Sequence, residues 1–315
     1  MQFAMAFKII GVLLILFSSA MLPSLFLSLV SQDGIESAFA IGFGATLAAG
    51  MLLWLPNRLL RRDLNIRDGF LVTALFWIVL GLFGAIPLWI TPQLSLSPVA
   101  AIFESISGLT TTGATVITGL DALPQSILLY RQLLQWLGGI GIIVLAVAIL
   151  PMLGIGGMQL YRAESAGPSK DRKLTPRITS TAKALFGIYL LLTVACALSY
   201  FAAGMSPFDA LCHAFSTVAI GGFSTHDASL GYYEEQGILL VSSLFMLFSA
   251  INFGLHFVAL QRRTARVYAR DSETAFFITV IALATVVTCS LLLTTETLGV
   301  EDSLIHGVFQ TVSIA

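Results

Sequence analysis

The most restrictive feature of this sequence is a polar, glycine-containing run that follows an apolar segment too short to cross a bilayer. Residues 107–115 read SGLTTTGAT, and residues 216–224 read STVAIGGFS. When the first serines of these runs are aligned, Gly113 matches Gly222. Near the C-terminal end Ser313 matches the same serine, and the sequence stops before a third polar run is reached. The pattern predicts a structural unit that is repeated along the chain.

The composition indicates a polytopic membrane protein. Of the 315 residues, 57% are hydrophobic and only 10% are charged, whereas soluble domains carry about 25% charged residues. The basic clusters lie between apolar segments, which argues against a nucleic-acid-binding face, and three cysteines in apolar surroundings argue against a disulfide framework. Windows of about 20 apolar residues predict spans near residues 7–30, 36–56, 70–90, 126–152, 184–203, 237–260 and 274–294.

Three apolar segments, near residues 97–109, 206–217 and 302–313, are only 12 or 13 residues long. A helix of that length reaches about halfway through a ~30 Å hydrocarbon core. If these segments do not cross, every cluster of Lys and Arg falls on the cytoplasmic side, as the positive-inside rule requires. Of the sixteen Lys and Arg residues, Arg131 alone then lies outside. The short segments are therefore predicted to be re-entrant half-helices.

The predicted fold is an all-α polytopic membrane protein, in which units of span, re-entrant half-helix, polar loop and span surround a central pore. Non-helical backbone at membrane depth is tolerated only where protein shields it or where it lines an aqueous cavity. Polar loops at equivalent positions therefore predict a pore that no single unit closes. We expect two leading helices in residues 1–68, a first pore repeat in 69–158, a basic cytoplasmic loop in 159–182, a second repeat in 183–262 and an incomplete third repeat in 263–315.

The chemistry of the polar loops suits a monovalent cation. Backbone carbonyl oxygens can replace the hydration shell of such an ion, and threonine hydroxyls add further oxygen ligands. Glycine permits backbone angles that a side chain would forbid, and the C-terminal ends of the half-helices favour positive charge. The residues expected to bind the ion are Thr110, Thr111, Thr112, Gly113, Val218, Ala219, Ile220, Gly221 and Gly222.

Other polar features have both a structural and a functional interpretation. The glycine runs at residues 138–141 and 154–157 lack the phosphate-loop pattern, so close helix packing is favoured. Glu104 and His213 occupy equivalent half-helix positions, where hydrogen bonds that brace the loops are favoured over direct contact with the ion. Ser107 and His213 lack the sequence context of a serine enzyme, so no enzymatic activity is expected.

Charged and imidazole side chains on the outer side leave several roles open. Arg131 either pairs with an outer carboxylate or repels cations that leak back. His226 and Asp227 are expected to make a loop contact at the outer mouth, and His256 is expected to pack between helices. The acidic outer loops either raise the local concentration of cations or are simply solvated.

Four motifs resemble the TrkH family of bacterial potassium uptake proteins, within the TrkH/KtrB/HKT superfamily. They are the SGLTTTGAT run, LGGIG at residues 137–141, KLTPR at 173–177 and GGFSTHD at 221–227. The resemblance runs from the first residue to the last, and the two leading spans are similar to those of TrkH proteins.

The resemblance implies a pore of four repeats, each giving one filter strand, with Gly113 and Gly222 in the positions associated with potassium selectivity. It implies low-affinity potassium uptake across the bacterial inner membrane, with the N-terminus in the cytoplasm and K+ as the transported ion without any cofactor. Sodium or ammonium transport stays an alternative, and the symport ion is left open. It also implies a homodimer in membrane lipid, gated by a cytosolic, nucleotide-binding TrkA-like subunit that contacts the basic loops at 159–183 and 261–273.

The third filter, a gating loop and a fourth repeat of that family do not occur in these 315 residues. We therefore expect either a fragment of a longer protein or a truncated, non-conducting product, and no selective pore from these residues alone.

Overall fold

The computed structural model describes residues 3–60, 66–144, 174–295 and 299–314, and the elements in these ranges are all helices. Short 3-10 turns join some of the helices; the turn at Ser19–Met21 joins the first two helices into one apolar span, Phe3–Ser31. The helices are α1 (Phe3–Ser18), α2 (Leu22–Ser31), α3 (Glu36–Trp54), α4 (Ile66–Ile90), α5 (Pro98–Leu109), α6 (Gln125–Val144), α9 (Leu174–Ala202), α10 (Pro207–Val218), α11 (Gln236–Ala250), α12 (Phe253–Arg262), α13 (Arg266–Arg270), α14 (Ser272–Thr294) and α15 (Val300–Ile314).

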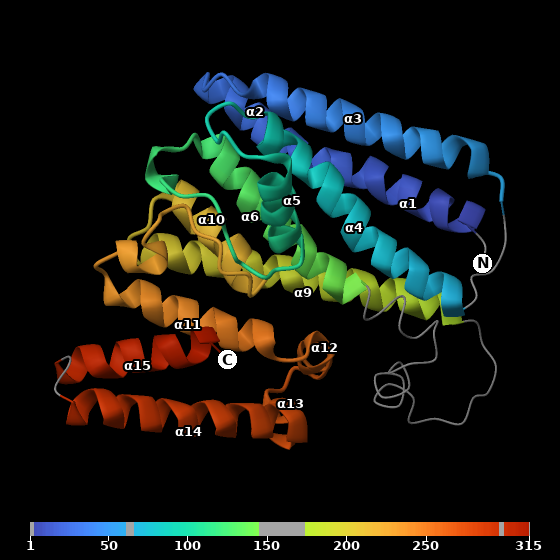
Figure 1. Cartoon of the computed structure of the whole chain (residues 1–315). Coiled ribbons are helices and arrows are strands. Elements are labelled where there is room, and N and C mark those ends of the chain that lie inside the picture. Colours follow the sequence, from blue (N-terminus) through green and yellow to red (C-terminus); the bar gives the residue numbers. More distant parts are fainter. Residues whose placement is uncertain (1–2, 61–65, 145–173, 296–298, 315) are drawn as a thin grey trace.

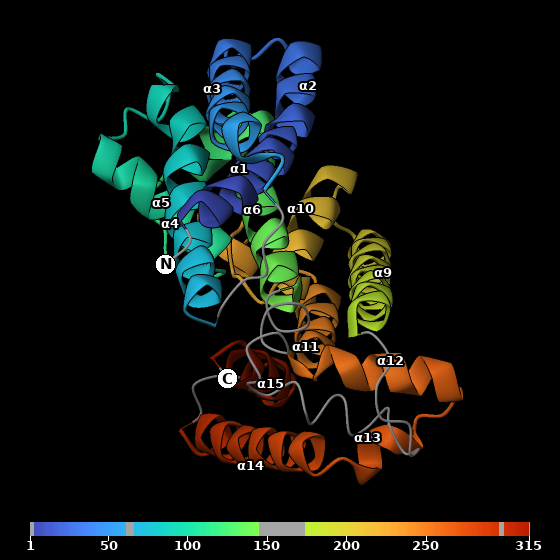
Figure 2. The same cartoon turned by 90° about the vertical axis from the view of Figure 1, so that its right-hand side faces the viewer.

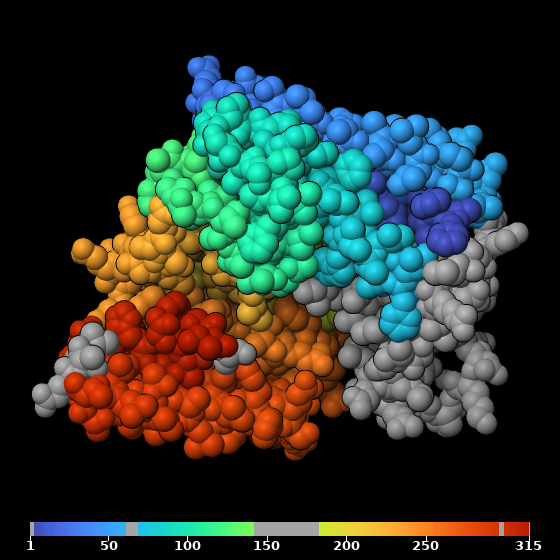
Figure 3. Space-filling view, viewed as in Figure 1, coloured from blue at the N-terminus to red at the C-terminus, as the bar shows by residue number. Residues whose placement is uncertain are grey.

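Most of the long helices lie side by side, and the short helix α5 stands across their direction (Figure 1). Viewed from the side, the leading helices α1 to α3 are at one end of the molecule and α13 to α15 are at the other (Figure 2). In the space-filling view, the segment that contains α5 lies between the leading helices and the second half of the chain (Figure 3). The N-terminal and C-terminal parts of the chain thus lie at opposite ends of the molecule, and α15 lies between α11 and α14 (Figure 1).

The same packing arrangement occurs three times. Each half-helix packs most closely on the long helix that precedes it, in the pairs α4–α5, α9–α10 and α14–α15. The long helix that follows a half-helix packs against the next half-helix, so that α6 contacts α10 and α11 contacts α15. The repetition predicted from the two polar runs is therefore present in the packing, and successive units are interlocked.

The two complete half-helices begin in the same way. Ser97 and Ser206 are the N-cap residues, and their hydroxyl groups accept hydrogen bonds from the amides of Ala100 (3.2 Å) and Asp209 (3.1 Å). A proline follows each serine at the first helical position, where its missing N–H has no helical partner to lose. Each helix then runs for 12 residues and ends at the polar loop.

Most predicted spans correspond to long apolar helices. In the described part of the chain, five helices are long and apolar enough to cross a membrane, and a bent pair brings the number to six. The span predicted at 126–152 begins with α6, and its end lies outside the described residues. Large apolar side chains are exposed along α14, where Phe276 is 73% exposed and Leu283 is 63% exposed.

The span predicted near residues 237–260 is broken into two helices. The chain bends by 91° between α11 and α12. Asn252 lies at the break, and its side-chain oxygen accepts a hydrogen bond from the amide of Gly254 (2.9 Å), so that it caps a new helix. The unbroken apolar character of the segment concealed this break, because hydropathy does not register a cap.

Candidate functional site

The loops that follow α5 and α10 have the same unusual backbone. Thr111 and Ile220 have φ of 54° and 52°, and Gly113 and Gly222 have φ of 76° and 82°. Thr111 and Ile220 are 109 residues apart in the chain, and so are Gly113 and Gly222. A positive φ is uncommon outside glycine and is an outlier for β-branched residues. Two sequences that share few residues therefore adopt one conformation, which the surrounding contacts must impose.

Matching backbone hydrogen bonds close both loops onto their half-helices. The amide of Thr112 donates to the carbonyl of Ser107 (2.9 Å), and the amide of Gly221 donates to the carbonyl of Ser216 (2.8 Å). The hydroxyl of Ser107 also donates to the carbonyl of Ala114 (2.6 Å). Each loop is thus tied back to the last turn of its own half-helix.

The carbonyl oxygens at the tips of the loops are left available. Among the described residues, no hydrogen bond is donated to the carbonyls of Thr110, Thr111, Thr112 and Gly113, nor to those of Val218, Ala219, Ile220 and Gly222. Thr112, Ile220 and Gly222 are exposed. Eight of the nine predicted site residues therefore offer free carbonyl oxygens.

Both loops open into a single cavity of about 380 Å³. Thr112 and Gly113 line it from the first loop, and Ile220 and Gly222 line it from the second. Ser313, near the end of α15, lines the same cavity. The structure therefore brings the ends of three half-helices together around one space.

The two loops approach each other so closely that only glycine fits at one position. A Cβ atom added to Gly113 would overlap the carbonyl oxygen of Gly221. The matching position Gly222 is different, since no atom lies within 4 Å of the place where its Cβ would be. Gly113 is thus required by both conformation and space, and Gly222 by conformation alone.

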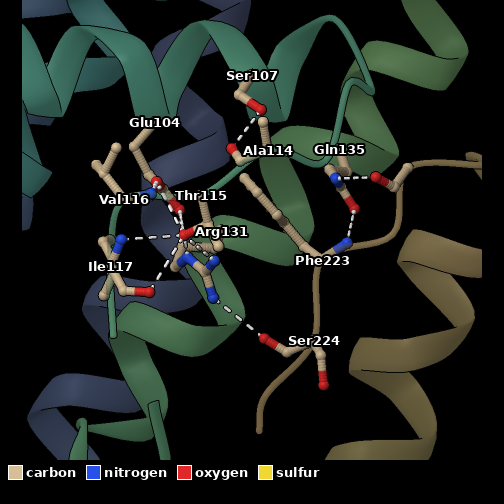
Figure 4. A network of polar contacts seen from close by, with 11 residues as sticks. Glu104, Ser107, Ala114, Thr115, Val116, Ile117, Arg131, Gln135, Phe223 and Ser224 are labelled. Carbon is tan, nitrogen blue, oxygen red and sulfur yellow. Dashed lines mark hydrogen bonds and ion pairs between the residues drawn. The ribbon is translucent and has the colours of Figure 1, made fainter. Parts of the chain in front are cut away.

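A buried ion pair braces the first loop (Figure 4). The Nε of Arg131 on α6 donates to Glu104 Oε1 on α5 (2.9 Å), and both residues are fully buried. The Glu104 carboxylate also accepts hydrogen bonds from the hydroxyl of Thr115 (2.9 Å) and the amide of Val116 (3.0 Å). Arg131 therefore pairs with a half-helix carboxylate, and not with an outer-loop carboxylate as one interpretation of the sequence proposed.

The same arginine reaches the second loop. Its guanidinium donates to the carbonyl oxygen of Ser224 (3.1 Å) and lies 4.4 Å from the centre of the Phe223 ring. A cation over an aromatic face is attracted by the ring quadrupole. The side chain of Arg131 thus joins the two repeats directly.

His213 has the corresponding position in the second repeat. Its Nε2 is 3.0 Å from the hydroxyl oxygen of Ser224, and its Nδ1 is 2.9 Å from the carbonyl oxygen of Asp209. Glu104 contacts Thr115 in the same way, 109 residues earlier (213 − 104 and 224 − 115). The structural role predicted for Glu104 and His213 is confirmed by these contacts. Ser107 and His213, the two residues considered for a serine enzyme, do not pair with each other, because the hydroxyl of Ser107 donates to the carbonyl of Ala114.

Gln135 is a bracing residue that the sequence did not reveal. It is fully buried on α6, its Nε2 donates to the carbonyl of Gly221 (2.8 Å), and its Oε1 accepts from the amide of Phe223 (3.0 Å) (Figure 4). The one signal that could have found it is an amide side chain within an apolar span, where polar groups are expensive.

The outer loops of the two repeats are also joined. The carboxylate of Asp227 accepts hydrogen bonds from the amides of Gly119 (2.9 Å) and Leu120 (3.0 Å). His226 bonds Asp121 (2.5 Å), and this hydrogen bond is the largest cause that lowers the pKa of Asp121. The loop contact predicted for His226 and Asp227 is confirmed.

Of the remaining predicted features, Gly138 and His256 make packing contacts and hydrogen bonds within the fold. A Cβ at Gly138 would overlap the carbonyl oxygen of Leu109, so this glycine serves close packing as predicted. His256 lies at the bend and bonds the hydroxyl of Tyr268 (2.8 Å) and the carbonyl of Phe248 (2.8 Å). The glycine run at 154–157 and most of the basic loop at 159–182 lie outside the described residues.

Comparisons with known proteins agree with one another. The family model for TrkH, described as a cation transport protein, matches residues 35–314. The Trk system potassium uptake protein TrkH of Halomonas elongata is 56% identical over 315 residues, which are 100% of this chain and 65% of that protein. Its Salmonella typhimurium namesake is 52% identical over 317 residues, again 100% of this chain and 65% of the relative.

A solved structure gives the same result. The crystal structure of the potassium transporter TrkH from Vibrio parahaemolyticus superposes with a TM-score of 0.91 at 48% identity, and the match covers 100% of this chain and 64% of that one. The chain thus spans about two thirds of the length of the relatives that it matches.

Proposed function

This chain belongs to the TrkH family of cation transport proteins, and we propose that it forms part of a pore for the uptake of potassium ions. The fold is that of a multi-pass membrane protein with repeated pore units. Members of the family are transporters and not enzymes. The observation that carries the proposal is the pair of loops with one backbone conformation that open into one cavity.

We assign ion binding to the free carbonyl oxygens of the two loops. A ring of carbonyl oxygens can replace the water around K+ as it enters a narrow pore. The alternation of positive φ at Thr111 and Gly113, with the residue between them at negative φ, recurs at Ile220 and Gly222. The C-terminal ends of α5 and α10 point at these loops, and the partial negative charge of a helix C-terminus favours a cation there.

Potassium is favoured over other monovalent cations by the names of the relatives, which are potassium uptake proteins. This choice is supported by the way the second loop is held, since Arg131 and Gln135 on α6 hydrogen-bond the carbonyls of Ser224 and Gly221. We propose that the protein resides in the bacterial inner membrane with its N-terminus in the cytoplasm, which is the orientation that the positive-inside rule favours. We further propose that the protein is a homodimer and that a TrkA-like nucleotide-binding subunit binds its cytoplasmic face and gates it.

The test is a permeability series on the complete reading frame that contains these residues. The protein is reconstituted in liposomes, and the fluxes of K+, Na+ and NH4+ are compared for the wild type and for Gly113→Ser. Wild-type protein is expected to pass K+ preferentially, and Gly113→Ser is expected to lose most of that preference because its side chain would displace the Gly221 carbonyl.

Gly119→Ser is the matched control. Gly119 also has a positive φ (74°), but it lies in the outer loop with no atom within 4 Å of an added Cβ. Equal permeation of K+ and Na+ by the wild type would refute potassium selectivity. Equal effects of the two substitutions would refute the role of Gly113 in the filter.

A further inference from the structure

We propose that the groove between α9 and α12 binds an anionic phospholipid of the surrounding membrane, with an acyl chain in the groove and the headgroup phosphate against Lys183 and Arg262. The groove has a volume of about 440 Å³. Its walls are almost entirely apolar, with Ile188 and Leu191 on α9 and Phe257 on α12. This site is separate from the cavity at the polar loops and does not depend on the transported ion.

The bend at the start of α12 makes this groove. Because α12 turns by 91° from α11, it runs across α9 instead of continuing along the span (Figure 2). Leu260 on α12 is 56% exposed beside the groove, and Leu191 on α9 is 58% exposed. An open apolar groove between helices that face lipid is filled by acyl chains when the protein is in a bilayer.

Two exposed cationic residues stand next in the chain to residues that line the groove. Ala184 and Gln261 line it, and their chain neighbours are Lys183 and Arg262, both exposed. Lys183 lies within α9, one residue before the first residue of that helix that lines the groove. Apolar depth with a basic rim is the arrangement that recognises an anionic headgroup attached to acyl chains.

Further arginines extend the basic rim along α12 and α13. Four arginines lie within nine residues, all are exposed, and none forms an ion pair with another described residue; they are Arg262, Arg263, Arg266 and Arg270. Free guanidinium groups are suited to phosphate, which they bind through two hydrogen bonds. The uncompensated positive charge therefore favours a phosphate diester headgroup over a zwitterionic one.

The experiment measures lipid binding by native mass spectrometry on the purified protein in detergent, titrated with phosphatidylglycerol or phosphatidylcholine. The wild type is expected to bind phosphatidylglycerol more tightly. The double variant Lys183→Gln/Arg262→Gln is expected to bind it about 25-fold more weakly, since one basic residue near a headgroup contributes about fivefold. Arg58→Gln, an exposed arginine after another span, is the charge control and should leave binding unchanged.

The groove itself is tested by filling it. No atom lies within 4 Å of a Cβ added to Gly187, so Gly187→Leu fits the fold and occupies the space of the acyl chain. It should weaken the binding of both lipids, whereas Gly44→Leu, equally unobstructed on the exposed surface of α3, should not. Leu260→Gln tests the opposite wall should Gly187→Leu fail to purify as a single species.

Three outcomes would overturn the proposal. They are equal affinity for the two lipids, binding that survives the double charge variant, and equal losses for Gly187→Leu and Gly44→Leu.

Discussion

Gln135 allows a sharp test of how the second loop is held, because a matched residue lies one turn away. Gln132 and Gln135 are both on α6, both are fully buried, and only Gln135 is hydrogen-bonded among the described residues. Leucine has nearly the volume of glutamine and removes only the amide. The two Gln→Leu substitutions therefore compare a bonded with an unbonded amide in one environment.

The two substitutions are expected to change the free energy of unfolding differently: Gln135→Leu should lower it and Gln132→Leu should not. Gln135→Leu leaves the carbonyl of Gly221 and the amide of Phe223 buried without partners, and each such group costs about 1–3 kcal/mol, so the loss is about 2–6 kcal/mol. Gln132→Leu removes an amide whose two polar atoms have no partner in the described structure, so it should be neutral or stabilising.

The assay is equilibrium unfolding in mixed micelles of mild detergent and SDS, followed by the K+/Na+ flux ratio in liposomes. Gln135→Leu should lower both stability and the flux ratio, because the Gly221 carbonyl loses the group that orients it. Gln132→Leu should change neither by a comparable amount. Equal destabilisation by the two substitutions would refute the reasoning, since the cost would then come from the shape of leucine and not from the lost hydrogen bonds.

Three further predictions concern the loops and their supports. Gly113→Ala should abolish potassium uptake in a strain that lacks other uptake systems, whereas Gly222→Ala, which meets only backbone strain of about 1–3 kcal/mol, should retain part of it. Arg131→Met should lower the free energy of unfolding by about 3–5 kcal/mol by leaving Glu104 charged and unpaired, and adding Glu104→Gln should restore part of that loss in the same micelle assay. The hydrogen bond from His226 lowers the pKa of Asp121, so this bond contributes to stability above the ordinary carboxyl pKa of about 3.9, and the contribution is lost as pH falls through the lowered pKa. The difference in melting temperature between the wild type and Asp121→Asn should therefore vanish on acidification. A difference that grows at low pH would contradict this.

The sequence predicted the repeated unit because its signals are local. A short apolar run precedes each polar loop, and Gly113 and Gly222 occupy equivalent positions in the two loops. A Ser-Pro pair, which the prediction did not use, also starts each complete half-helix. These signals depend on helix capping and on backbone conformation, which neighbouring residues determine. The existence of the half-helices and the positions of their loops could therefore be predicted without any knowledge of tertiary packing.

The contacts between repeats could not be predicted in this way. Gln135 and Arg131 act on residues about 90 positions further along the chain, and the intervening sequence contains no pattern that specifies the pairing. The 91° bend after α11 was missed for a related reason, since Asn252 is one polar residue in an apolar run and its effect depends on the surface that α9 offers to α12.

Thr111 and Ile220 explain why these long-range contacts are needed. Both are β-branched, and both have a positive φ that costs about 1–3 kcal/mol in such residues. Glycine would adopt this φ without strain, but a loop with another glycine would have more backbone conformations available to it. The strained conformation persists only because the surrounding structure over-determines it, through the half-helix bonds of each loop and the α6 side chains behind the second. If the loops bind ions as proposed, discrimination between ions needs a restricted backbone, and the contacts from neighbouring repeats restrict the backbone of each loop.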